Sequence, residues 1–227
     1  MSMMHPLLLC EEKCGGEGER SLENFRFNLE RKDWTLQKHY SKEGITVKSV
    51  YDQEKLMYFL FTEAPLDFEC DWTFGDMRDH TLEATPEWYS DVKEYSVLER
   101  LTDVCWVVHE VLEPKLGGIV ASREMLYASH CRKIGDAYFV SMGSTEWPGV
   151  EPRENLVRAE VPEGCGLSIS PDPSHHTTRT LLRWVFSLDL KIPLVPVSFL
   201  LPFHVEACRQ FILGLRKHLS ARQLLKA

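Results

Sequence analysis

The sequence predicts an α+β fold, in which a strongly curved antiparallel sheet of about nine strands packs against one long C-terminal helix. Near the C-terminus, large apolar residues recur every four positions, which on an α-helix forms one apolar stripe. Upstream, short apolar segments alternate with turn residues at the spacing of β-hairpins. The strand–helix alternation of parallel sheets is missing, so the sheet is expected to be antiparallel.

Composition favours one soluble domain. The chain has 227 residues, a net charge of -8 and 44% hydrophobic residues, and it contains no apolar run of ~18 residues that would span a bilayer. The acidic balance argues against a general nucleic-acid binder. Seven scattered cysteines lack metal-ligand spacing and indicate free thiols in a reducing compartment, so a cytoplasmic location is expected. We expect no metal and no cofactor.

The N-terminal region is expected to open with a flexible tail over residues 1–20, which is rich in glycine and glutamate and lacks the basic start of a signal peptide. A single domain then spans 21–224. Ser21 can cap a helix over Leu22–Arg31. Three short strands follow as a meander: Thr35–Tyr40, Ile45–Tyr51 and Leu56–Phe61.

A helix within Pro65–Asp79, broken near Gly75, separates this meander from a second series of strands. Those strands share a short apolar pattern between turn residues: Val92–Arg100, Val104–Leu112, Met125–Lys133, Tyr138–Ser144, Leu156–Glu160, Gly166–Ser170 and Thr178–Leu190. The last helix covers Val197–Arg222. Pro202 is expected either to begin this helix or to kink it, because proline cannot donate a backbone hydrogen bond.

From Trp88 onward the sequence resembles the START domain family of lipid-transfer proteins, and within it the cholesterol-carrying subgroup. The matching motifs follow one another in family order: W-Y-S-D-V-K-E at 88–94, H-E at 109–110, R-A-E at 158–160, W-V-F-S-L-D-L-K at 184–191 and L-R-K-H-L at 215–219. The resemblance implies a helix-grip fold with an internal tunnel that the last helix roofs. It implies carriage of one lipid, and no catalysis.

Glu110 is the polar residue that the resemblance places inside the tunnel. It lies in an apolar strand, where a carboxylate must be paired, hydrogen-bonded or at a rim. In the cholesterol-carrying subgroup the matching glutamate pairs with an arginine on the next strand, and Ser129 stands at that position here. Glu110 is therefore expected to pair with His130 or Arg132 through a register shift, to bind through water, or to be protonated because it is desolvated.

The remaining lipid contacts are expected from the apolar stripe and the tunnel wall. Phe211, Leu215 and Leu219 match ligand-facing helix positions of the family, and Phe203 and Ala207 share their face. The full expected set is Val108, Glu110, Ser129, Val140, Val161, Phe203, Ala207, Phe211, Leu215 and Leu219. The alternative is an ordinary helix stripe on a solid core, without a tunnel.

The expected function is that of a monomeric carrier of a cholesterol-like sterol, with transient contact to membrane surfaces. Trp147, in a loop rich in proline and glycine, is expected to join Arg216, Lys217 and Arg222 in a weak membrane-docking face, unless it packs to pin the loop. The alternatives are a carrier or sensor of phospholipid or another lipid, and an enzyme on the same scaffold, for which Glu110 would be the only acid–base candidate.

Overall fold

The computed structural model describes residues 15–115, 118, 120–192 and 195–225. One ten-stranded sheet runs in the order β1-β2-β3-β10-β9-β7-β6-β5-β4, and β8 pairs in parallel with β6. All other pairs are antiparallel. The strands are β1 Thr35–Tyr40, β2 Ile45–Asp52, β3 Met57–Leu66, β4 Val92–Thr102, β5 Cys105–Leu112, β6 Arg123–Ile134, β7 Ala137–Ser144, β8 Val157–Arg158, β9 Cys165–Pro171 and β10 Thr180–Phe186.

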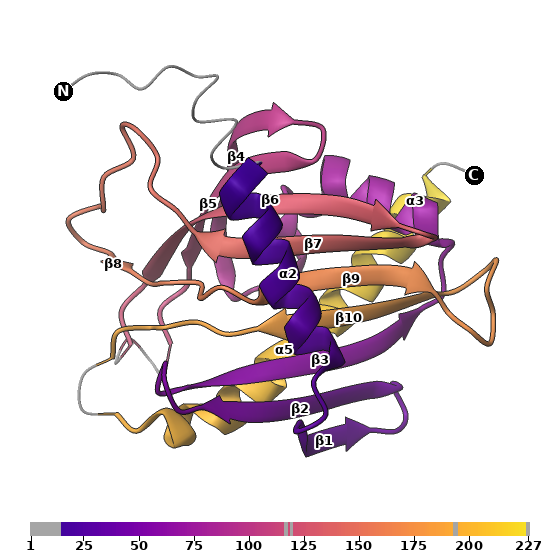
Figure 1. The fold of residues 1–227 in the computed structure, drawn as a ribbon, viewed down its shortest axis with the longest axis horizontal. Helices are drawn as coiled ribbons and strands as arrows, with labels where there is room; N and C mark the ends of the chain where they lie inside the picture. Colours follow the sequence, from indigo (N-terminus) through magenta and orange to yellow (C-terminus); the bar gives the residue numbers. More distant parts are fainter. Residues whose placement is uncertain (1–14, 116–117, 119, 193–194, 226–227) are drawn as a thin grey trace.

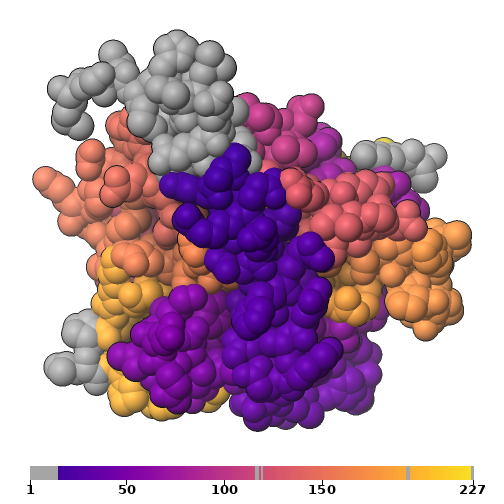
Figure 2. Space-filling model, in the orientation of Figure 1, coloured from indigo at the N-terminus to yellow at the C-terminus, as the bar shows by residue number. Residues whose placement is uncertain are grey.

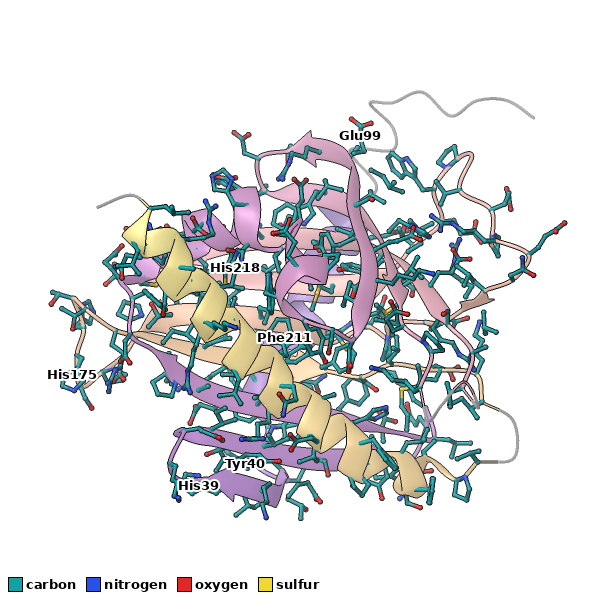
Figure 3. The ribbon with its side chains drawn as sticks, turned by 180° about the vertical axis from the view of Figure 1, so that it is seen from behind. His39, Tyr40, Glu99, His175, Phe211 and His218 are labelled. Carbon is teal, nitrogen blue, oxygen red and sulfur yellow. The ribbon has the colours of Figure 1, made fainter. Side chains whose placement is uncertain are left out.

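The helices lie on the two faces of this sheet. They are α2 Glu17–Glu30, α3 Cys70–Asp76 with the π-helix η2 Met77–Thr81, α4 Thr85–Trp88 and α5 Val197–Leu224. Helix α2 crosses the outer face, where it forms the middle of the surface in Figure 2 (Figures 1 and 2). Helix α5 runs diagonally across the opposite, inner face (Figure 3). Within the described ranges, no helix has the length and apolar content that crossing a membrane requires.

Helix α2 begins earlier than expected. Residues 17–20, predicted as part of the tail, are already helical, and Ser21 lies inside the helix instead of capping it. Glu17 and Glu19 occupy the first turn, where negative charge favours a helix N-terminus. The rest of the predicted tail, residues 1–14, lies outside the described part of the chain.

A glycine on β9 lets α2 approach the sheet. Phe25 is fully buried beneath the helix. A Cβ at Gly166 would lie 2.8 Å from the Phe25 ring and 2.4 Å from the carbonyl oxygen of Val140. The absent side chain therefore makes room for the phenylalanine that fixes α2 on the outer face.

Long-range pairing sets the lengths of several strands. The three-stranded meander is confirmed, but β3 extends to Leu66 because its last residues pair with β10, where Thr180 faces Leu66. The segment predicted over 156–160 reduces to the two residues of β8. Gly75 does not break the expected helix, because α3 continues through it into η2.

Helix α5 is fixed mainly through its C-terminal two thirds by three arginines. Arg209 donates from Nε to Glu43 at 2.8 Å. The Arg216 guanidinium donates 2.7 Å hydrogen bonds to the carbonyl oxygens of Glu43 and Pro65. Arg222 Nε lies 2.7 and 2.9 Å from the two carboxylate oxygens of the buried Asp76. These bonds tie the helix to the β1–β2 turn, to β3 and to α3.

The start of α5 differs from its end. The helix begins at Val197, so Pro202 lies inside it. Phe199 is 58% exposed and Phe203 49% exposed, whereas Phe211, Leu215 and Leu219, further along the same apolar stripe, are buried. At Gly214 the helix packs directly on Trp88, whose carbonyl oxygen would lie 2.6 Å from an added Cβ.

Candidate functional site

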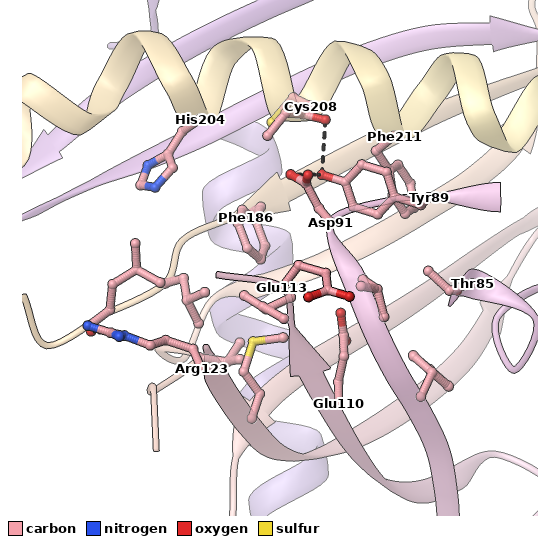
Figure 4. A pocket seen from close by; sticks show the side chains of 18 of the residues that line it. Thr85, Tyr89, Asp91, Glu110, Glu113, Arg123, Phe186, His204, Cys208 and Phe211 are labelled. Atoms are coloured by element: carbon pink, nitrogen blue, oxygen red, sulfur yellow. Dashed lines mark hydrogen bonds between the residues drawn. The ribbon is translucent and has the colours of Figure 1, made fainter. Parts of the chain in front are cut away.

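A cavity of about 480 Å³ lies between the inner face of the sheet and the N-terminal half of α5 (Figure 4). This volume falls within the ~300–1,000 Å³ that small-molecule pockets occupy. Side chains from β4, β5, β6, β7, β9, β10 and α5 form its walls, and most of them are apolar or aromatic. The inner side of this domain is therefore not a solid core.

Seven of the ten residues expected to contact lipid border this cavity: Glu110, Ser129, Val140, Val161, Phe203, Ala207 and Phe211. Val108 is fully buried on β5 but is not part of the lining. Leu215 and Leu219 are also fully buried and lie beyond the cavity, in the packed end of α5. The apolar stripe thus divides into a cavity-facing part and a core-facing part.

Phe211 marks the boundary between these two parts. Its ring centroid lies 4.5 Å from that of Trp184, 5.3 Å from that of Trp88 and 5.5 Å from that of Tyr89. The Tyr89 hydroxyl is also 3.3 Å from the carbonyl oxygen of Ala207 (Figure 4). An aromatic cluster therefore closes the cavity beneath the middle of the roof helix.

Glu110 projects into the cavity from β5. The hydroxyl of Tyr127 donates a 3.0 Å hydrogen bond to its Oε2. Burial raises the pKa of the Glu110 carboxyl from 4.5 to about 7, an effect that the Tyr127 hydrogen bond opposes in part. Tyr95 faces Glu110 across the β4–β5 ladder and also borders the cavity. Two phenols thus accompany this carboxyl.

The register of β5 and β6 decides between the expected partners of Glu110. Glu110 lies opposite Met125, and Ser129 lies opposite Trp106. His130 and Arg132 alternate to the outer face, where both meet Glu19 of α2. The expected pairing of Glu110 with His130 or Arg132 is therefore wrong, and the raised pKa agrees with the desolvation alternative.

His204 enters the cavity from the roof. It lies on α5 between Phe203 and Val205, and Figure 4 shows its ring directed from the helix into the cavity. Burial lowers the pKa of the imidazole, which favours its neutral form. Among the described residues, no hydrogen bond or ion pair to its ring is formed.

A buried carboxylate holds the loop that follows β7. Glu124 is fully buried and lies 2.8 Å from His109 Nε2. It also accepts a 2.9 Å hydrogen bond from the backbone N–H of Arg153 and lies 3.3 Å from Arg158 Nε. Burial would raise the pKa of Glu124, but these donors lower it overall. The carboxylate therefore fastens this loop to β5 and β6.

The expected membrane-docking face is not assembled. Arg216 and Arg222 bind carbonyl and carboxylate oxygens inside the molecule. Trp147 is half-buried in its loop. The loop that follows β7 and the C-terminal end of α5 lie on opposite sides of the view in Figure 1, so these two segments do not form one face.

Sequence reasoning missed Tyr127, Tyr95 and His204. Tyr127 precedes Ser129 by two residues, so strand alternation alone places both on one face of β6. His204 falls one position beside the four-residue stripe, which drew attention to Phe203 instead. Within the described ranges, no group of three or more potential metal ligands occurs.

Comparison with known proteins identifies relatives of this architecture. A family model described as the START domain matches residues 28–200. The mitochondrial steroidogenic acute regulatory protein of Danio rerio is 28% identical over 120 residues, which cover 52% of this chain and 41% of the relative. The Mus musculus protein is 26% identical over 161 residues, 70% of this chain and 55% of the relative. These matches therefore span about half the length of the curated relatives.

Solved structures share the fold at low identity. Human StAR-related lipid transfer protein 5 superposes with a TM-score of 0.82 and 16% identity, covering 94% of this chain and 99% of that one. Human STARD10 superposes with a TM-score of 0.66 and 21% identity, covering 88% and 83%. The curved sheet gripping a C-terminal helix is thus the common feature.

Proposed function

The chain belongs to the START domain family, and from this premise we propose that it carries one lipid molecule, a cholesterol-like sterol, in the cavity beneath α5. The observation that carries this proposal is a cavity of about 480 Å³ with a mainly apolar lining and the Glu110–Tyr127 pair on its wall. An apolar lining stabilises a sterol by ~25 cal/mol for each Å² it removes from water. The polar pair would meet its hydroxyl.

The carrier performs no chemistry in this proposal. A sterol with one hydroxyl needs one hydrogen-bonding group and an otherwise dry wall. The Arg partner expected of Glu110 is absent, so a carboxyl with a pKa of about 7 takes its place as both donor and acceptor. This chemistry suits a neutral hydroxyl better than a phosphate, which favours the sterol over a phospholipid.

Lipid exchange is proposed to occur at the first turns of α5, during brief contact between a cytoplasmic protein and a membrane surface. Phe203 borders the cavity and is also 49% exposed, so it lies at the mouth. Phe199, one turn earlier, is 58% exposed, and the two ring centroids are 5.9 Å apart. With a net charge of -8, apolar insertion is a stronger basis for membrane contact than charge attraction.

Native mass spectrometry with lipid extraction, followed by titration with a fluorescent sterol, tests the cargo. We expect saturable one-to-one binding that Ala207→Trp abolishes, because the indole would fill the cavity. The matched change Lys217→Trp, on an exposed position of the same helix, should leave binding intact. A co-purified phospholipid without sterol binding would show that the cargo is a phospholipid and not a sterol. A well-folded protein that binds no lipid would refute the carrier function.

A sterol-transfer assay between vesicles tests whether the mouth of the cavity is the part that contacts the membrane. Phe199 does not line the cavity, so Phe199→Ser should slow sterol transfer without changing equilibrium sterol binding. Phe27→Ser removes an aromatic that is 70% exposed on the outer helix α2 and serves as the control. Equal transfer rates for the two variants would place the membrane contact elsewhere.

A further inference from the structure

Two of the polar side chains that border the cavity, Glu110 and His204, lie far apart along the chain and on different walls. Glu110 belongs to the sheet, whereas His204 belongs to the roof helix (Figure 4). Two other polar residues of α5, Glu206 and Gln210, also border the cavity, and their side chains are bonded to each other. His204 differs from them because its ring has no hydrogen bond within the described ranges.

The imidazole of His204 has hydrogen-bonding capacity that the protein does not use. In its neutral form the ring carries one donor and one acceptor. No described side chain or backbone group bonds to it, and no charged group contributes to its pKa, which burial alone lowers. His204 is half-buried, and its ring loses water when a lipid fills the cavity that it faces. Because a polar group that loses water without gaining a partner costs binding free energy, its unused donor and acceptor point to a partner in the ligand.

Glu110 has unused capacity as well. Tyr127 bonds to Oε2, and within the described ranges Oε1 receives no hydrogen bond. The basic side chains that border the cavity have partners within the protein, since Lys115 pairs with Asp91 and Arg123 donates to backbone carbonyl oxygens. Neither Glu110 nor His204 is paired with an opposite charge. Both are suited to uncharged oxygen groups such as hydroxyls and carbonyls.

We infer that the ligand is a lipid with two separated uncharged oxygen groups, such as a sterol with a second hydroxyl, and that His204 selects it over lipids with one. This inference rests on the proposed carrier function. A site with an unused polar group binds the ligand that satisfies it more tightly than an analogue that leaves it unpaired. One neutral hydrogen bond corresponds to about a tenfold preference.

Competition binding with cholesterol and with its 25-hydroxy derivative tests the inference on the full chain. The unmodified protein should prefer the dihydroxy sterol about tenfold. His204→Leu should remove this preference by weakening the 25-hydroxysterol while keeping cholesterol binding, since leucine preserves an apolar wall. His39→Leu, at an exposed position on β1, should leave both affinities unchanged.

The outcomes separate the inference from the proposed function. Equal affinity for the two sterols, or an equal loss of both in His204→Leu, would overturn the inference and leave the carrier function intact. A folded protein that binds neither sterol would overturn both. Retention of the preference in His204→Leu would exclude His204 as the selecting group.

Discussion

The buried carboxyl of Glu110 makes a prediction about stability that needs no ligand. Its pKa is raised from 4.5 to about 7 in the folded protein, chiefly by desolvation. The folded state therefore binds this proton more tightly than the unfolded state, and stability falls as pH rises between these two values. Below pH 4.5 both states are protonated and the penalty vanishes. Above pH 7 both are ionised and the penalty is complete, at about 3 kcal/mol.

Replacing this carboxyl by an amide should remove the penalty. Glu110→Gln has nearly the same shape as the protonated carboxyl but no charge to desolvate. In urea unfolding of the ligand-free protein, we expect its stability advantage over the unmodified protein to grow by about 2.5 kcal/mol from pH 5 to pH 8. Measuring the difference between the two proteins cancels every other titrating group.

The matched control is Glu99→Gln, at an exposed position on the neighbouring strand β4 (Figure 3). Its stability should track that of the unmodified protein at every pH. If the Glu110→Gln and unmodified curves run parallel from pH 5 to pH 8, then Glu110 is ionised in the folded state at low pH. The desolvation argument, and with it the neutral character of the cavity wall, would be wrong.

Two further predictions concern how the roof helix is held. Arg222→Ala should lower the unfolding free energy by ~3 kcal/mol in urea titrations, because it leaves the buried Asp76 without its guanidinium; a loss within 0.5 kcal/mol would contradict this. Gly214→Ala should lower the thermal midpoint of unfolding, because the new Cβ would lie 2.6 Å from the Trp88 carbonyl oxygen. The control Gly75→Ala places its Cβ where no atom lies within 4 Å, so it should raise the free energy of unfolding by ~0.5–1 kcal/mol. Equal effects of the two alanines would show that the helix moves freely at Gly214.

Much of the fold could be predicted because helices and strands each produce their own spacing of apolar residues along the sequence. β1 was predicted with its observed bounds, and the start of α5 at Val197 followed from the apolar stripe. The ends of strands that depend on pairing with a strand far away in the sequence could not be predicted. The extension of β3 to Leu66 requires β10, which begins more than a hundred positions later.

The candidate site was predictable in outline, and its polar details were not. The period of four marks which side of α5 is apolar, but Phe211 and Leu215 look alike in sequence although only Phe211 borders the cavity. Whether a buried side chain faces a cavity or a packed neighbour depends on the far wall. The partner of Glu110 likewise depends on β5–β6 register, which places Tyr127 within reach and turns His130 away.

The uneven attachment of α5 has a mechanical consequence. The three arginine contacts restrain the helix from residue 209 onward. Pro202 has no backbone N–H, so one of the hydrogen bonds that would hold the first turn of α5 to the second is missing. Opening the cavity by swinging the whole helix would break every arginine contact at once. Unwinding about one turn breaks none of them, so we expect hydrogen exchange to be fastest before residue 204. The cavity would then open by local unwinding of the first turn of α5, while the rest of the helix stays attached to the sheet.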